Sequence, residues 1–258
     1  MTHHLTLENL VIEANAQPLV EGVGFTVRSG ELVALVGESG AGKSLTGRSL
    51  VGILPSSVHL RSGTVTWHRP GEPDIVIEAP PAPNRSEALS RLRGQGVAWI
   101  PQDAGAALVP VHTVQRQLRD ALRHVGASSD RPHCAQQLAQ VGFAEPDAVL
   151  DLYPHMLSGG MARRVQVALG LSLGAAFLMA DEPTTGLDRP VQARLLQTLG
   201  RIRDRGTGIL LITHDLRMVE RHADRVIVFD QGRVVAEGTP DLLQTHHHAA
   251  VQRLRGQP

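Results

Sequence analysis

Short apolar stretches, separated by glycine, proline and polar turns, predict most of the regular structure of this chain. An alternating pattern over 5–12 and a second run over 24–28 predict strands with one buried face. A further segment predicts a hairpin with its turn at 230–232. Continuous apolar runs predict strands buried on both faces, as in a parallel sheet; these runs span 31–37, 97–100, 177–180 and 208–213.

Helical periodicity occurs between these strands, which is the order typical of an α/β protein. A proline-rich segment over 69–85 predicts an exposed connection around one edge strand at 75–77. Apolar residues at three- and four-residue spacing predict helices; their ranges are 43–54, 113–125, 132–142, 165–173 and 191–205.

Composition limits the possible classes of function. With 42% apolar and 19% charged residues among 258, the chain fits an ordinary soluble globular protein. Its zero net charge gives no attraction to nucleic acid, and its single cysteine, Cys134, excludes an internal disulfide. The N-terminus resembles no signal peptide, and the most apolar run, 165–180, is too short to span a bilayer. We therefore expect a cytosolic chain that reaches a membrane only through a partner.

A glycine-rich segment between the strand at 31–37 and the next helix has the pattern G-x-x-x-x-G-K-[ST] of a phosphate-binding loop. Its glycines let backbone N–H groups turn toward an anion, and the helix N-terminus adds positive potential. We expect Lys43 to reach the β- and γ-phosphates of ATP, and Ser44 to ligate Mg²⁺. The residues expected to bind ATP here are Gly37, Glu38, Ser39, Gly40, Ala41, Gly42, Lys43, Ser44 and Leu45.

Lys43 is the only lysine among 25 basic residues. A compact ammonium group fits inside a cradle of phosphate oxygens, whereas a planar guanidinium group does not. The sequence therefore marks this position as one where arginine does not replace lysine.

Two carboxylates follow the apolar strand at 177–180. Asp181 suits a Mg²⁺ ligand that acts through water, and Glu182 suits a general base that polarises the attacking water. Adjacent acids at a strand end are also common as solvated surface groups. The pair gains its meaning from the phosphate loop upstream.

Three further motifs follow the phosphate loop in order: Leu157-Ser-Gly-Gly-Met161, Glu182-Pro-Thr-Thr-Gly-Leu-Asp188 and Thr213-His214-Asp215. Together with the loop they resemble the ATP-binding-cassette (ABC) ATPases over essentially the whole chain. The resemblance implies an α/β fold with a RecA-like P-loop core, an antiparallel β subdomain and an inserted helical subdomain. It implies a single domain, 1–258, whose core spans 1–102 and 172–258 and whose helical subdomain spans about 103–171.

The resemblance also implies roles for individual residues. Gln102 resembles the glutamine that contacts Mg²⁺ and senses the transmembrane partner, and His214 resembles the switch histidine at the γ-phosphate. Asp188 resembles an aspartate of the dimer interface. Catalysis would rest on Glu182, His214 and Lys43, with Ser44, Gln102 and Asp181 holding Mg²⁺. The signature residues, which bind ATP held by the opposite subunit, are Ser158, Gly159 and Gly160.

The segment 153–161 is similar to the YPHxLSGGM stretch of the peptide/nickel import group, and 52–55 is more similar to its nickel-type ATPases. This implies an importer ATPase for nickel, a metal chelate or small peptides, at the cytoplasmic face of the inner membrane. Its partners would be two permease subunits, a second ATPase subunit in a homo- or heterodimer, and indirectly a solute-binding protein. An alternative is a soluble accessory ATPase of a carbon–phosphorus lyase assembly. An ATPase acting on DNA or ribosomes is disfavoured, because those are usually tandem or carry long coiled-coil insertions.

The sequence departs from the family at two places. Arg163 lies where the family often has glutamine. The segment 13–16 lacks the aromatic residue on which many members stack adenine.

Overall fold

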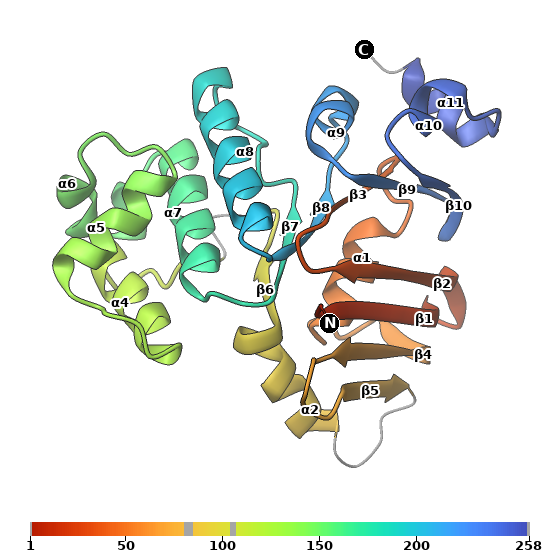
Figure 1. The fold of residues 1–258 in the computed structure, drawn as a ribbon, viewed down its shortest axis with the longest axis horizontal. Helices are drawn as coiled ribbons and strands as arrows, with labels where there is room; N and C mark the ends of the chain where they lie inside the picture. Colours follow the sequence, from red (N-terminus) through yellow and green to blue (C-terminus); the bar gives the residue numbers. More distant parts are fainter. Residues whose placement is uncertain (1, 80–84, 104–106, 257–258) are drawn as a thin grey trace.

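The computed structural model describes residues 2–79, 85–103 and 107–256, and its strands form two sheets (Figure 1). The antiparallel sheet has the order β2-β1-β4-β5, and the larger sheet has the order β10-β9-β3-β8-β7-β6. The strands of the first are β1 (His4–Ala14), β2 (Gln17–Arg28), β4 (His59–His68) and β5 (Ile75–Ala79). Those of the second are β3 (Leu32–Gly37), β6 (Val97–Ile100), β7 (Phe177–Asp181), β8 (Gly208–Ile212), β9 (Arg225–Asp230) and β10 (Arg233–Gly238).

Helices α4, α5 and α6 lie together at one end of the molecule, and α7 lies between them and the larger sheet (Figure 1). Their apolar side chains share one core with β6, β7 and β8. Boundaries of a helical subdomain at 103 and 171 stay a prediction. The helices are α1 (Lys43–Leu50), α2 (Arg85–Arg91), the π-helical η1 (Leu92–Gly96), α4 (Val114–His124), α5 (Arg131–Gln140), α6 (Pro146–Leu150), the 3₁₀ turn η2 (Pro154–Met156), α7 (Gly159–Ser172), α8 (Arg189–Asp204), α9 (Leu216–His222), α10 (Leu242–Thr245) and α11 (Ala249–Arg255). Among the described residues, no helix combines the length and apolarity needed to span a membrane.

The strands predicted from continuous apolar runs form the centre of the larger sheet. β3, β7 and β8 are buried along their whole length, which confirms the expectation of a sheet covered on both faces. β9, β3, β8, β7 and β6 run parallel to one another. Their carboxyl ends therefore meet at one edge, which is where open α/β sheets bind ligands.

Two predicted helices have different ends in the structure. The helix expected over 43–54 ends at Leu50, because Gly52 has a left-handed φ of 64° and Pro55 follows. The helix expected to begin at 165 begins at Gly159. Its N-cap is Ser158, whose hydroxyl accepts a hydrogen bond of 3.3 Å from the backbone N–H of Met161.

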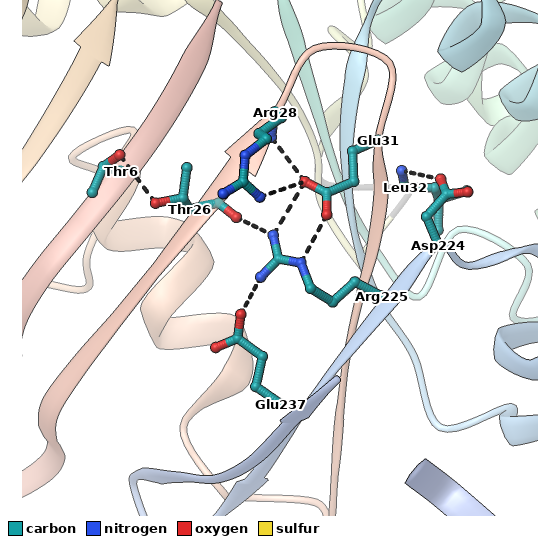
Figure 2. Close-up of polar contacts among 8 residues, drawn as sticks. All are labelled: Thr6, Thr26, Arg28, Glu31, Leu32, Asp224, Arg225 and Glu237. Carbon is teal, nitrogen blue, oxygen red and sulfur yellow. Dashed lines mark hydrogen bonds and ion pairs between the residues drawn. The ribbon is translucent and has the colours of Figure 1, made fainter. Parts of the chain in front are cut away.

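The two sheets are joined through Arg225 on β9 (Figure 2). Its Nε donates to Oε1 of Glu31 at 2.7 Å and its Nη2 to Oε2 of the same carboxylate at 3.1 Å. The same guanidinium also donates to Glu237 on β10 and to the carbonyl of Thr26 on β2. The side chains of Arg225 and Glu31 are 15% and 16% exposed, so this is a largely buried bidentate ion pair.

Candidate active site

A cleft of about 600 Å³ opens at the carboxyl edge of the parallel strands. It brings together all residues predicted for the phosphate loop, the predicted acids and the predicted histidine, from segments far apart in the sequence. Within the described ranges, no phenylalanine, tyrosine or tryptophan lines it. The lining consists of Gly37, Glu38, Ser39, Gly40, Ala41, Gly42, Lys43, Ser44, Leu45, Gln102, Asp181, Glu182, Thr185, Ile212 and His214.

The phosphate loop requires glycine at two of its positions. Gly37 has φ 154°, and a Cβ there would lie 2.4 Å from the carbonyl oxygen of Phe229. Gly42 has φ 101°, and a Cβ there would lie 2.9 Å from a methyl group of Val20. Gly42 is also the N-cap of α1, so the loop runs directly into a helix N-terminus. Such a terminus favours the binding of phosphate.

The ammonium group of Lys43 is held by neutral backbone groups. Nζ donates to the carbonyl oxygens of Gly37 and Glu38, each at 2.8 Å, and the residue is 9% exposed. Burial lowers the pKa of Lys43, and the carboxylates of Glu182 and Asp181 partly oppose that shift. The cleft therefore contains a buried cation suited to an anionic ligand.

Asp181, at the end of β7, is the most unusual polar group of the cleft. It is 1% exposed, and within the described part of the chain neither carboxylate oxygen has a hydrogen-bond partner. Burial raises the pKa of Asp181, with the Ser44 hydroxyl opposing and the Glu182 carboxylate adding to the rise. Buried polar groups normally have partners. A carboxylate without one beside a hydroxyl fits Mg²⁺, a hard cation that prefers oxygen ligands.

Glu182 follows Asp181 in a left-handed conformation, with φ 49°. Its Oε1 lies 2.7 Å from Nδ1 of His214, which follows β8, and its Oε2 accepts from the Thr185 hydroxyl at 3.2 Å. A non-glycine residue in this conformation stores strain, which surrounding contacts must compensate. The result is an oriented carboxylate at the mouth of the cleft, suited to accepting a proton from water.

The predicted signature residues and Asp188 do not line this cleft. Ser158 and Gly159 are exposed at the start of α7, and Asp188 is exposed at the start of α8, where it accepts from Val191 N at 2.9 Å. The two segments are neighbours, because a Cβ on Gly160 would lie 3.8 Å from the Gly186 carbonyl oxygen. Together they form one surface outside the cleft.

Three residues at or beside the cleft were not predicted to take part: Thr185 and Ile212, which line it, and Arg163. Thr185 binds Glu182 through its hydroxyl, and its place in the segment Glu182-Pro-Thr-Thr is a signal that could have indicated it. Arg163 on α7 is 3% exposed and donates to the backbone carbonyls of Gln102 and Asp181. No pattern in the sequence indicates that contact.

Comparison with known proteins agrees with this geometry. The model of the family described as "ABC transporter" matches residues 20–185. The nickel import ATP-binding protein NikD of Rhodospirillum rubrum is 40% identical over 257 residues, which is 97% of this chain and 93% of that protein. The oligopeptide transport ATP-binding protein AppD of Bacillus subtilis is 39% identical over 229 residues, 87% of this chain and 67% of that protein. A solved structure of an ATP-binding subunit of an ABC transporter matches with a TM-score of 0.79 at 28% identity, covering 98% of both chains.

Proposed function

Because the chain belongs to the ABC transporter family, we propose that it is the ATP-hydrolysing subunit of an importer for nickel, a metal chelate or small peptides. The names of two relatives, one for nickel import and one for oligopeptide transport, support this range of cargo. The observation that carries the proposal is the cleft in which the phosphate loop, Asp181 and Glu182 meet.

In this proposal the phosphate loop binds the triphosphate of ATP. Backbone N–H groups of the loop and the N-terminus of α1 face the phosphate oxygens. Lys43 donates to the β- and γ-phosphates. Because burial lowers the pKa of Lys43, its charged form gains stability when the anionic ligand arrives.

Ser44, Gln102 and Asp181 would hold Mg²⁺. When bound, Mg²⁺ neutralises negative charge on the β- and γ-phosphate oxygens. Asp181 is suited to this role because its two buried oxygens have no hydrogen-bond partner among the described residues.

Glu182 is the proposed general base. It accepts a proton from the water that attacks the γ-phosphorus, and the bond between that phosphorus and the leaving oxygen of ADP breaks. The Nδ1 of His214 lies against the Glu182 carboxylate, and the ring is exposed at the cleft. With a proton on each ring nitrogen, His214 would hold Glu182 through Nδ1 and donate to the γ-phosphate through Nε2. The products are ADP and inorganic phosphate.

A second ATPase subunit, identical or related, would complete the site. The exposed surface formed by Ser158, Gly159, Gly160 and Asp188 would bind ATP held in the partner's cleft, which their position outside this chain's own cleft supports. Two permease subunits, and indirectly a solute-binding protein, would complete the importer at the cytoplasmic face of the membrane. ATP-driven closure of the dimer would then drive the permeases.

Glu182→Gln tests the chemical part of the proposal. We expect steady-state phosphate release to fall by at least about 100-fold while ATP affinity stays within about 2-fold, because only transition-state stabilisation is lost. Glu8→Gln, at an exposed position on β1, is the matched control. Turnover close to that of the wild type in Glu182→Gln would refute the assignment of the base.

Uptake assays test the cargo. The chain is co-expressed with its permeases, and uptake of nickel, a nickel chelate and a dipeptide is measured. The Glu182→Gln variant, which should not hydrolyse ATP, is the negative control. ATP-dependent uptake of one of these classes is expected. Active ATP hydrolysis without uptake of any of the three would contradict the proposed cargo and leave the ATPase assignment standing.

A further inference from the structure

Arg163 lies inside the protein between two chain segments that border the cleft. On one side its Nη2 donates to the carbonyl oxygen of Asp181 at 2.8 Å and also to that of Glu182. Its Nε donates to the carbonyl oxygen of Pro183 at 3.2 Å. One guanidinium group thus binds three consecutive carbonyls at the point where β7 ends.

On its other side the same guanidinium binds the segment that follows β6. Nη1 donates to the carbonyl oxygen of Gln102 at 3.1 Å and also to that of Pro101. Nη1 further donates to Oε1 of Gln166 at 2.7 Å, one turn along α7. Nε2 of Gln166 donates to the carbonyls of Pro101 and Asp103 at 2.9 and 3.3 Å. The two side chains of α7 together hold the segment that contains Gln102.

These contacts use the full donor capacity of arginine. A guanidinium group has five N–H donors in a rigid plane, and here the acceptors outnumber them. Lysine carries its donors on a single nitrogen, and glutamine has two N–H donors, also on a single nitrogen. Neither replacement can make all of these contacts at once. The contacts also compensate the left-handed backbone of Glu182, since its carbonyl is among the acceptors.

We propose that Arg163 is a positioning residue that fixes the segment carrying Gln102 to the segment carrying Asp181 and Glu182. It thereby sets the distance between the residues that would hold Mg²⁺ and the general base. The link between the segments stands on the hydrogen bonds alone. Its consequence for catalysis rests on the proposed function of the cleft.

The test compares Arg163→Lys with Arg225→Lys. Arg225 is the matched control because it is largely buried, also binds several partners, and contacts neither of the two segments that border the cleft. Hydrogen exchange is measured for peptides covering 97–103 and 181–187. Each variant is measured at the same number of degrees below its own melting temperature. We expect about 10-fold faster exchange in both peptides for Arg163→Lys and no change for Arg225→Lys.

Steady-state kinetics give the second measurement. We expect kcat for ATP to fall by about 10- to 100-fold in Arg163→Lys while KM stays within about 2-fold, because catalytic groups are misplaced although the phosphate loop is intact. Gln166→Ala removes the contacts of Gln166 to the segment after β6 and the acceptor that its Oε1 offers to Arg163, but it removes no contact to the segment after β7. It should accelerate exchange in 97–103 and leave 181–187 unchanged.

Exchange that rises in only one peptide for Arg163→Lys, or no more than for Arg225→Lys, would overturn the link between the segments. A kcat within about 2-fold of wild type would overturn its catalytic consequence. If Arg163→Lys does not fold, hydrogen exchange in the same two peptides is measured for Arg163→Gln and Gln166→Ala instead. If the wild type hydrolyses no ATP, the proposed function fails, and the exchange data still decide the link.

Discussion

Arg163 and Arg225 both join distant segments from inside the protein, but their surroundings are chemically opposite. Arg225 lies between the carboxylates of Glu31 and Glu237. Burial lowers its pKa, but these ion pairs outweigh burial and leave the pKa raised. Arg163 is held by backbone carbonyls and one amide. There burial dominates, and the pKa is lowered although the charges of Asp181 and other acids oppose it.

The comparison separates a region whose buried charges are paired within the folded chain from a region whose buried charges are suited to a ligand. Where the two sheets meet, each buried charge has a fixed counter-charge, which is the arrangement that burial of ions requires. In the cleft, Arg163 uses the backbone of Asp181 and Glu182 and leaves their carboxylates to other partners. The charges buried in the cleft compensate one another only in part, which suits the proposed binding of a nucleotide and a cation.

The largest effect on stability is expected where the sheets meet. Arg225→Met leaves Glu31 buried without its bidentate partner, and we expect the free energy of unfolding to fall by about 3 kcal/mol. Urea unfolding measures this. ATP affinity of the folded variant should stay within about 2-fold of wild type, since Arg225 does not line the cleft. A loss of affinity as large as the loss of stability would break the separation of the two regions.

For a substitution in the cleft, we expect the free energy of unfolding to rise instead of fall. Burial raises the pKa of Asp181, so its charged form is less stable in the folded state than in the unfolded state. Asp181→Asn should therefore raise the free energy of unfolding in EDTA by about 1 kcal/mol, and it should weaken Mg²⁺-dependent stabilisation by ATP. Thermal unfolding with and without Mg²⁺-ATP measures both. A less stable Asp181→Asn protein in EDTA would show that this carboxylate has a structural partner.

The smallest expected effect is a loss of stability at acid pH. Burial raises the pKa of Glu31, but hydrogen bonds from Arg225 and Arg28 outweigh it, and the pKa lies below the ordinary value of 4.5. This stabilisation is present above pH 4.5 and is lost as pH falls through the lower folded-state pKa. Between pH 7 and pH 3, wild type should lose more stability than Glu31→Gln, by about 1 kcal/mol or less. Equal losses in urea unfolding at the two pH values would contradict the assignment.

The elements that were predicted correctly are those marked by a pattern within their own residues. The apolar runs of β3, β7 and β8 are continuous because both faces are covered. β4 was not predicted, since Arg61, Ser62 and Gly63 interrupt its pattern and its stability depends on pairing with distant strands. The first turn of α7 was missed because two glycines are poor helix formers, and only the Ser158 cap reveals the start.

The candidate site shows the same limit. Most residues lining the cleft were predicted from motifs at known spacing, and Thr185 and Ile212 were not. The role of Arg163 was not, because its partners are backbone carbonyls, which every residue has and no sequence pattern marks. The contacts form only when β6, β7 and α7 come together, and this depends on the packing of the whole chain.

The single lysine has a consequence for handling the protein. Lys43 is the only lysine side chain of the sequence, and it is 9% exposed inside the phosphate loop. Amine-reactive dyes, cross-linkers and coupling resins, which normally attach to surface lysines, have one side-chain target here apart from the α-amino group of the chain. Labelling at Lys43 would therefore serve as a direct reporter of whether the cleft is occupied, with no background from other lysines.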